Sequence, residues 1–160
     1  MGKKKTYSFS YHVYQSFDEL RAADQKLVKS AIDATRNSYS PYSGFQVGAA
    51  LLLENGQIIT GTNQENTAFP SGLCAERTAM FAAGNQFPDV PYTALAVAAK
   101  SVKFPVTEPV QPCGACRQVM SQHEIKFNKS FRLLLYGESG EVWEIEKASA
   151  LLPFSFHPKL

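Results

Sequence analysis

The sequence predicts an α/β protein in which helices are layered on a mixed β-sheet of five strands. Three observations lead to this prediction. Helical periodicity alternates with short apolar runs along the chain, one pair of apolar runs is joined by Asn55 and Gly56, and the chain is 160 residues long with 44% hydrophobic residues. This length and composition suit a single compact domain with its own core, and alternating helices and strands are typical of an α/β sandwich.

The first helix is expected over residues 18–36. Apolar residues recur there at spacings of three and four, which is the pattern of an amphipathic helix; they are Leu20, Ala23, Leu27, Ala31 and Ile32. Ser40, Pro41 and Gly44 follow this segment and predict a loop that ends it.

The next two strands are expected to form a hairpin. The segment FQVGAALLLENGQIITGTN places Asn55 and Gly56 between two apolar runs. This dipeptide is the strongest short-range signal for a two-residue hairpin turn.

The rest of the chain is expected to alternate helices and strands. A helix over residues 74–83 should end at Gly84, and a strand buried on both faces should begin at Thr93. A second short helix is expected over residues 114–122, strands are expected from Ser130 and Glu141, and a last helical turn is expected over residues 147–152.

Charge and hydropathy disfavour nucleic acid and membranes as partners. The formal net charge is only +2, and the one basic run, Lys3 to Lys5, is typical of a solvated tail. No segment approaches the roughly 18 consecutive apolar residues of a membrane-spanning helix, and the N-terminus has no apolar signal core. The sequence therefore predicts a cytoplasmic protein. Three cysteines, an odd number, favour a metal site or reactive thiols over a disulfide framework.

The cysteines lie in two short stretches, GLCAERTA with Cys74, and QPCGACRQ with Cys113 and Cys116. Catalytic zinc sites have three protein ligands and one open position, whereas structural sites have four. Three thiols therefore favour a catalytic zinc site. Two alternatives remain open: a structural site completed by His123, and a dithiol redox pair that would leave Cys74 and Glu76 without a role.

The neighbours of the cysteines suit a catalytic metal site. Cys74 and Cys113 would each stand at the start of a helix, where free backbone N–H groups and the helix dipole favour a thiolate. Arg77 could donate hydrogen bonds to the sulfurs and offset their negative charge. Glu76 could reach a water at the open position and move its proton.

These motifs resemble the signature of the zinc deaminases, in which a ligand, any residue and Glu are followed later by Pro-Cys-x-x-Cys. CAE at residues 74–76 and PCGAC at residues 112–116 match it. More narrowly, the chain resembles the small homotetrameric cytidine deaminases of pyrimidine salvage. The similarity runs through PYSGFQVGAAL, GTNQENTAFPSG, PCGACRQV and LLPFSF, from about residue 41 to residue 156.

The resemblance implies a three-layer α/β/α sandwich around a mixed five-stranded sheet, and one zinc ion per subunit. The expected ligands are Cys74, Cys113 and Cys116. The expected reaction is hydrolytic deamination of cytidine and deoxycytidine to uridine and deoxyuridine plus ammonia, with Glu76 as the catalytic proton carrier and Arg77 tuning the charge of the sulfurs.

The resemblance also implies substrate contacts. Phe45 is similar to the aromatic residue that packs on the pyrimidine ring, and Asn63 and Glu65 resemble the pair that binds the ribose. Backbone groups near Ala75 and Cys113 are expected to hold the edge of the base. Phe156 resembles a residue that enters a neighbouring subunit's site in a homotetramer.

The chain departs from the family at its N-terminus. Residues 1–15 are expected to form an extension, either a tail or an edge strand, before one catalytic domain over residues 16–160. Two alternative functions remain: a zinc deaminase for another cytosine-containing substrate, such as a nucleotide, a blasticidin-type drug or a polynucleotide, and a non-enzymatic structural zinc module.

Overall fold

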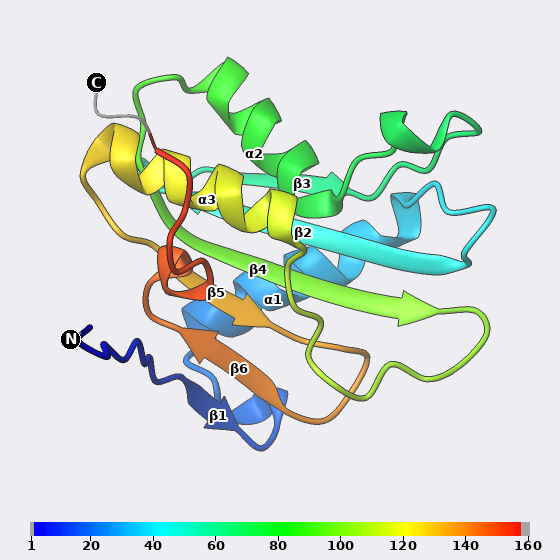
Figure 1. Ribbon diagram of the computed structural model, residues 1–160. Coiled ribbons are helices and arrows are strands. Elements are labelled where there is room, and N and C mark those ends of the chain that lie inside the picture. The colour runs from blue at the N-terminus through cyan, green and yellow to red at the C-terminus, as the bar shows by residue number, and fades with distance from the viewer. Residues whose placement is uncertain (1, 158–160) are drawn as a thin grey trace.

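The computed structural model describes residues 2–157, which form one mixed six-stranded sheet with helices on both faces (Figure 1). The strand order is β1-β6-β5-β4-β2-β3, and β4 and β5 are the parallel pair. The strands are β1 His12–Tyr14, β2 Phe45–Leu53, β3 Ile58–Thr62, β4 Tyr92–Ser101, β5 Arg132–Leu135 and β6 Val142–Ile145. The predicted mixed sheet between helical layers is confirmed, with six strands where five were expected.

The sixth strand is the edge strand β1, which lies in the N-terminal extension. It pairs antiparallel with β6, with Val13 opposite Trp143. Three residues, of which two are exposed, give too weak a pattern to be distinguished from a tail by sequence alone.

The central strands are buried on both faces, as their continuous apolar sequence predicts. Along β4, Leu95 and Val97 belong to the core beneath α2 and α3, whereas Ala94, Ala96 and Ala98 belong to the core beneath α1. Figure 1 shows α1 on one side of the sheet, and α2 and α3 on the other. The small alanines on the α1 side allow that helix to pack closely on the sheet.

Two glycines let helix backbones contact the sheet directly. A Cβ on Gly48 of β2 would lie 2.1 Å from the carbonyl oxygen of Ala31, and a Cβ on Gly61 of β3 would lie 2.3 Å from the amide nitrogen of Ala79. No other residue type fits at either position without movement of the backbone. Gly61 therefore sets the depth at which α2 lies on the sheet.

The helices differ from their predicted ends. They are α1 Ala22–Ala34, α2 Ala75–Gln86 and α3 Gly114–Phe127, with short 3-10 segments at Phe17–Glu19, Thr35–Asn37, Phe69–Ser71 and Ala148–Leu151. The prediction that Gly84 ends α2 is wrong: Gly84 lies on an exposed face, and the helix continues to Gln86, before Phe87 and Pro88. Helix α3 ends at Asn128, which adopts the left-handed conformation with φ 48°.

The β2–β3 hairpin turns where Asn55 and Gly56 predict, but its loop is longer. The Leu53 amide donates to the Gln57 carbonyl at 2.9 Å, which leaves three residues in the loop instead of two. Gly56 has φ +84°, the conformation of the glycine that closes a three-residue hairpin loop.

A buried ionic network ties α1 to the sheet. The Arg132 guanidinium of β5 donates to Asp24 of α1 at 2.9 and 3.2 Å and to Glu144 of β6 at 2.5 Å. The Tyr14 hydroxyl of β1 donates to the other oxygen of Glu144 at 2.7 Å. Asp24 and Glu144 are 4% and 7% exposed, so this network connects four elements within the protein interior.

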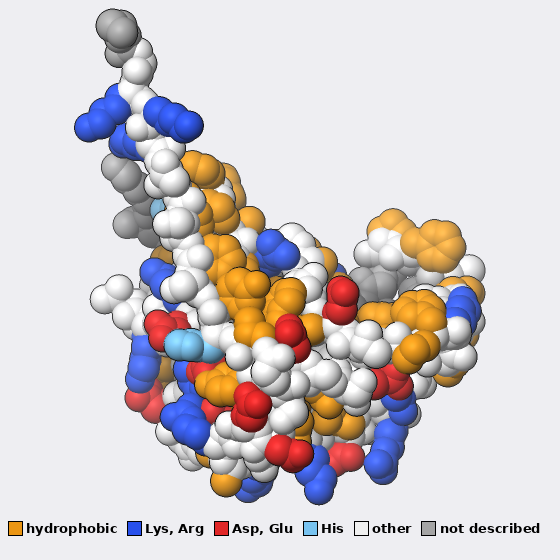
Figure 2. Space-filling model, turned by 90° about the horizontal axis from the view of Figure 1, so that it is seen from below, with side chains coloured by type: hydrophobic (Ala, Val, Ile, Leu, Met, Phe, Trp, Pro, Cys, Tyr) orange, Lys and Arg blue, Asp and Glu red, His pale blue; other side chains and the backbone are white. Residues whose placement is uncertain are grey.

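Before β1, residues 2–11 form an arm without regular secondary structure. Figure 2 shows it projecting from the body, with lysines toward its end and hydrophobic side chains beside its base. The Tyr7 hydroxyl donates to the Ala150 carbonyl at 2.7 Å, and Tyr11 packs on Trp143 with ring centroids 5.2 Å apart.

In residues 2–157, no helix combines the length and the hydropathy that crossing a membrane requires.

Candidate metal centre

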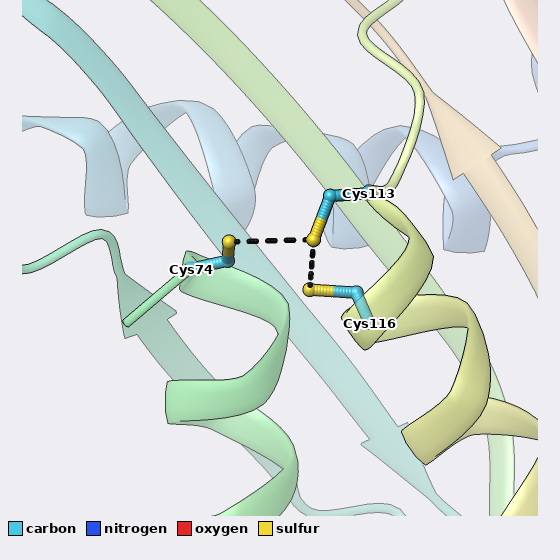
Figure 3. Close-up of side chains that lie close together, drawn as sticks. All are labelled: Cys74, Cys113 and Cys116. Carbon is cyan, nitrogen blue, oxygen red and sulfur yellow. Dashed lines mark hydrogen bonds between the residues drawn. The ribbon is translucent and has the colours of Figure 1, made fainter. Parts of the chain in front are cut away.

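The three cysteines meet at the N-terminal ends of α2 and α3. Cys74 and Cys113 are the N-cap residues of these two helices, both with extended backbones, and Cys116 lies in the first turn of α3. Figure 3 shows the three side chains converging in the space between the helix ends. The N-terminal dipoles of two helices therefore point at one group of sulfurs, where they favour negative charge.

The spacing of the sulfurs fits a tetrahedral metal ion. The Sγ atoms of Cys74 and Cys113 are 3.7 Å apart, those of Cys113 and Cys116 are 3.5 Å apart, and all three lie within 4.8 Å of one another. Zinc–sulfur bonds of about 2.3 Å in a tetrahedron place the sulfurs about 3.8 Å apart. A disulfide would need a separation of about 2.05 Å. The cluster can thus hold one zinc ion through three thiolates, with a fourth position open.

The surroundings favour a thiolate at Cys74. A hydrogen bond with Cys116 lowers the pKa of Cys74 to about 5, with further contributions from Arg77 and Cys113 that together outweigh the effect of burial. Arg77 Nη2 donates to the Cys74 sulfur at 3.7 Å. The Arg77 Nε atom is buried and has no hydrogen-bond partner within residues 2–157, so this guanidinium keeps an unused donor beside the sulfurs.

Glu76 is a buried carboxylate in the first turn of α2. It is 4% exposed, and burial, followed by the charge of Cys74, raises its pKa above the usual range of a glutamate. A raised pKa lies closer to neutral pH, so the group can both accept and release a proton there. This suits a general acid and base. Ala75, which precedes it, is fully buried and begins α2.

A cavity of about 530 Å³ connects the metal cluster to the polar loop after β3. Cys74 lies on its wall together with Asn63, Glu65, Phe69 and Tyr42. The two residues expected to bind ribose are therefore on the wall of the same cavity as one expected metal ligand. A cavity of this volume is in the range of small-molecule sites.

Asn63 and Glu65 also have structural partners. Asn63 Oδ1 accepts from the Val47 amide at 2.8 Å and Nδ2 donates to the Phe45 carbonyl at 2.8 Å, which fixes the start of β2 to the end of β3. Glu65 Oε2 accepts from the Tyr42 amide at 2.8 Å. Hydrogen bonding, with Ser43 first, lowers the pKa of Glu65, so it stays ionised.

Phe45 and Phe156 do not line this cavity. Phe45 lies at the start of β2 with its ring 6.3 Å from that of Phe104. Phe156 is 78% exposed, and its backbone is held by Gln118 of α3. Within a single chain, neither ring therefore belongs to the cavity that Cys74 lines.

His123 is separated from the sulfurs. Its ring stacks on Tyr92 at 3.3 Å, its Nε2 accepts from the Tyr92 amide at 3.2 Å, and burial lowers its pKa to about 4. Within residues 2–157 the cluster of possible metal ligands contains three cysteines and no histidine. A structural site completed by His123 is therefore not supported.

Sequence reasoning missed Arg117, the residue directly after Cys116. Its Nε donates to the carbonyl of Pro112, which immediately precedes Cys113, at 2.7 Å, and its Nη1 donates to the Leu151 carbonyl at 3.1 Å. The arginine after the pair Cys113 and Cys116 was visible in QPCGACRQ, but its partners, one of them 34 residues away, were not.

Proteins of similar sequence identify the family to which this site belongs. Residues 21–128 match the family model of the cytidine and deoxycytidylate deaminase zinc-binding region. The cytidine deaminase of Halalkalibacterium halodurans is 44% identical over 133 residues, covering 82% of this chain and 92% of that protein, and the cytidine deaminase of Sporosarcina psychrophila is 42% identical, covering 82% and 90%.

Solved structures of cytidine deaminases share the fold. The crystal structure of the enzyme from Burkholderia pseudomallei has a TM-score of 0.71 and 36% identity, covering 82% of this chain and 97% of that one. The enzyme from Mycobacterium tuberculosis has a TM-score of 0.64 and 30% identity, covering 86% and 100%. The chain therefore belongs to the cytidine and deoxycytidylate deaminase zinc-binding family.

Proposed function

We propose that this protein hydrolytically deaminates cytidine and deoxycytidine, giving uridine or deoxyuridine and ammonia. The observation that supports this most directly is the set of three sulfurs at the spacing of a tetrahedral ion, with the buried carboxylate of Glu76 two residues after Cys74. In the reaction, water adds its oxygen to C4 of the ring, and the amino group leaves as ammonia. The named relatives are cytidine deaminases, which supports the same substrate class.

In this proposal Cys74, Cys113 and Cys116 hold one zinc ion per subunit. Zinc bound there supplies a Lewis acid that makes water reactive near neutral pH. Arg77 and the two helix N-termini stabilise the negative charge of the three sulfurs.

Glu76 is proposed as the catalytic proton carrier. Its carboxylate takes a proton from the attacking water and passes it to ring N3, which makes C4 more electrophilic. A second proton passing through the same carboxyl group then converts the amino group into a good leaving group. The raised pKa of Glu76 supports this double role, since the group must both accept and release a proton in each turnover.

The cavity supplies the proposed contacts to the sugar of the nucleoside. Asn63 retains one N–H beyond its bond to Phe45, and Glu65 retains its Oε1 oxygen, so together they can donate to and accept from sugar hydroxyls. Phe45 is proposed to pack on the pyrimidine, and backbone groups of Ala75 and Cys113 to bind the edge of the base.

We further propose a homotetramer in which Phe156 completes the site of a neighbouring subunit. An aromatic ring that is 78% exposed on a segment bound to α3 is suitably placed for such a contact.

Residues 1–15 are proposed as an extension that precedes one catalytic domain at 16–160. Residues 158–160 of that domain lie outside the described part of the chain. The cytoplasm is the proposed location, because free thiols there stay reduced.

The test is ammonia release by zinc-loaded protein from cytidine, deoxycytidine, dCMP and single-stranded DNA. Release from the two nucleosides, and inhibition by a hydrated pyrimidine that mimics the tetrahedral intermediate, are expected. Glu76→Gln should retain zinc but lose about 10²- to 10⁴-fold in kcat, whereas Glu108→Gln, a change at an exposed glutamate, should not alter it. Release only from dCMP or DNA would assign another substrate, and bound zinc without any deamination would favour a structural module.

A further inference from the structure

One face of α3 binds the C-terminal segment, defined here as residues 148–156. Figure 1 shows this segment, coloured toward red, lying alongside α3. Four residues on one face of α3 contact it through hydrogen bonds; they are Arg117 to Leu151, Gln118 to Phe156, Ser121 to Ser155, and Glu124 to Ala148 and Ser149. The helix that carries two cysteines in its first turns therefore also fixes the C-terminal segment.

Arg117 differs from the other members of this face because it contacts two segments. Its Nε reaches back along the chain to the Pro112 carbonyl at 2.7 Å, and its Nη1 reaches the Leu151 carbonyl at 3.1 Å. Gln118, the next residue, contacts Phe156 through both its amide atoms and makes no bond to the metal loop, defined here as residues 102–113.

The position of Cys113 depends on few other interactions. The metal loop contains no helix or strand, and the Cys113 side chain is exposed; its other anchors are the buried neighbour Pro112 and the bond from the Arg117 amide to the Cys113 carbonyl at 3.0 Å. Cys113 has an extended backbone with φ −68° and ψ 166°, and no side chain caps the helix there. The direction of its sulfur therefore follows the orientation of the Pro112–Cys113 peptide, and the Arg117 bond fixes the carbonyl of that peptide.

We propose that Arg117 is a positioning residue of the metal centre. It orients the Pro112–Cys113 peptide so that the Cys113 sulfur faces Cys74, and the Leu151 carbonyl holds the guanidinium in place. Retention of zinc is thereby coupled to the C-terminal segment. This inference rests on the proposed assignment of Cys113 as a zinc ligand.

The test measures zinc release into excess chromogenic chelator from the zinc-loaded protein, below its unfolding temperature. Arg117→Ala and Arg117→Lys are both expected to release zinc at least about tenfold faster, in line with the effect of removing partners that orient metal ligands. Lysine keeps the charge but lacks the planar fork that spans two carbonyls. Gln118→Ala is the matched control: it removes the bonds to Phe156 but leaves the Arg117 bonds to Pro112 and Leu151 in place, so its release rate should stay within about twofold of the wild type.

A second readout separates positioning from general stability. In cobalt-substituted protein, the thiolate-to-cobalt absorption should change in Arg117→Lys and stay unchanged in Gln118→Ala. Wild-type release rates in both Arg117 variants, or equal acceleration in Gln118→Ala, would overturn the inference. Cys113→Ser tests the ligand assignment separately: loss of zinc in that variant with normal retention in the Arg117 variants refutes only the role of Arg117, whereas full retention in Cys113→Ser refutes the ligand set itself.

Discussion

At the scale of single residues, Gly61 has the strongest influence on where the site lies. Its missing side chain lets the first turns of α2 rest on β3, with the backbone of Ala75 and Ala79 against it. Since Cys74 and Glu76 flank Ala75, the depth of this contact sets their height above the sheet. Gly61 therefore influences the positions of Cys74 and Glu76, although it does not line the cavity.

Gly61→Ala should lower the free energy of unfolding by about 1–3 kcal/mol, as overpacking of a tight contact does, and should reduce zinc retention. Chemical denaturation and metal analysis measure both effects. Gly84→Ala in α2, the helix that packs on Gly61, provides the control: a Cβ there meets no atom within 4 Å, so it should be neutral or stabilise by about 0.5–1 kcal/mol. Equal effects of the two substitutions would contradict the role of Gly61.

Some residues of the site could be predicted from spacing and others could not. CAE and PCGAC identify a ligand set because only a few kinds of site use cysteines at that spacing, and the three sulfurs do converge. The bonds of Asn63 to the start of β2 and of Arg117 to Leu151 join segments 16 to 34 residues apart. Such pairings depend on the tertiary arrangement, which no local pattern records.

At the scale of elements, the network around Arg132 fixes α1 to the sheet. Burial opposes ionisation of Asp24 and Glu144, but hydrogen bonds outweigh it, so both pKa values are lowered. Arg132 is the main hydrogen-bond donor to both carboxylates. Arg21 adds a bond to Asp24, and Tyr14 adds one to Glu144. A carboxylate with a lowered pKa in the folded protein stabilises it above the unfolded pKa of about 4 and ceases to do so as the pH falls through the folded value. The network therefore stabilises the protein at neutral pH and fails in acid.

Arg132→Met should cost about 3–5 kcal/mol at pH 7, because it leaves two buried carboxylates without their partner. The loss should shrink below about pH 4 as these groups become protonated. Urea unfolding at several pH values measures this. For comparison, Arg36→Met breaks a pair with Asp33 whose side chains are 76% and 52% exposed, and it should cost less than about 1 kcal/mol at any pH; a pH-independent loss for Arg132→Met would argue against the network.

The elements themselves were largely predictable, and their ends were not. Apolar runs and the Asn55–Gly56 turn located the five strands β2 to β6, whereas for residues 1–15 the sequence left a tail and an edge strand open, and β1 pairs there with β6. Helix α3 extends five residues beyond its expected end because its later turns bind the C-terminal segment through Glu124, a buried polar contact that hydrophobic periodicity does not register.

At the scale of the whole molecule, the proposed homotetramer would use the exposed C-terminal aromatic residues. Phe154 and Phe156 are 99% and 78% exposed on a segment that α3 holds in place. Four chains of 17.6 kDa would give an assembly of about 70 kDa. Sedimentation should detect this mass.

Phe156→Ala should raise KM for cytidine and leave the zinc content unchanged, because the ring is proposed to act in a neighbour's cavity and does not contact the metal. Steady-state kinetics and metal analysis test this. Lys29→Ala is a suitable comparison, because this exposed residue belongs to α1, which lies on the other side of the sheet from α2 and α3. An unchanged KM in Phe156→Ala would remove the support for shared sites.

The sulfurs of Cys74 and Cys113 belong to residues 39 positions apart in the chain. One zinc ion bound by both sulfurs would close a ring of that size, as a covalent crosslink would. By reducing the conformational entropy of the unfolded chain, it would stabilise the folded protein by about 4 kcal/mol in the loop-closure model. Removing zinc with a chelator should therefore lower the melting temperature markedly, and returning zinc should restore it. The same ion would then also hold the N-terminal ends of α2 and α3 together.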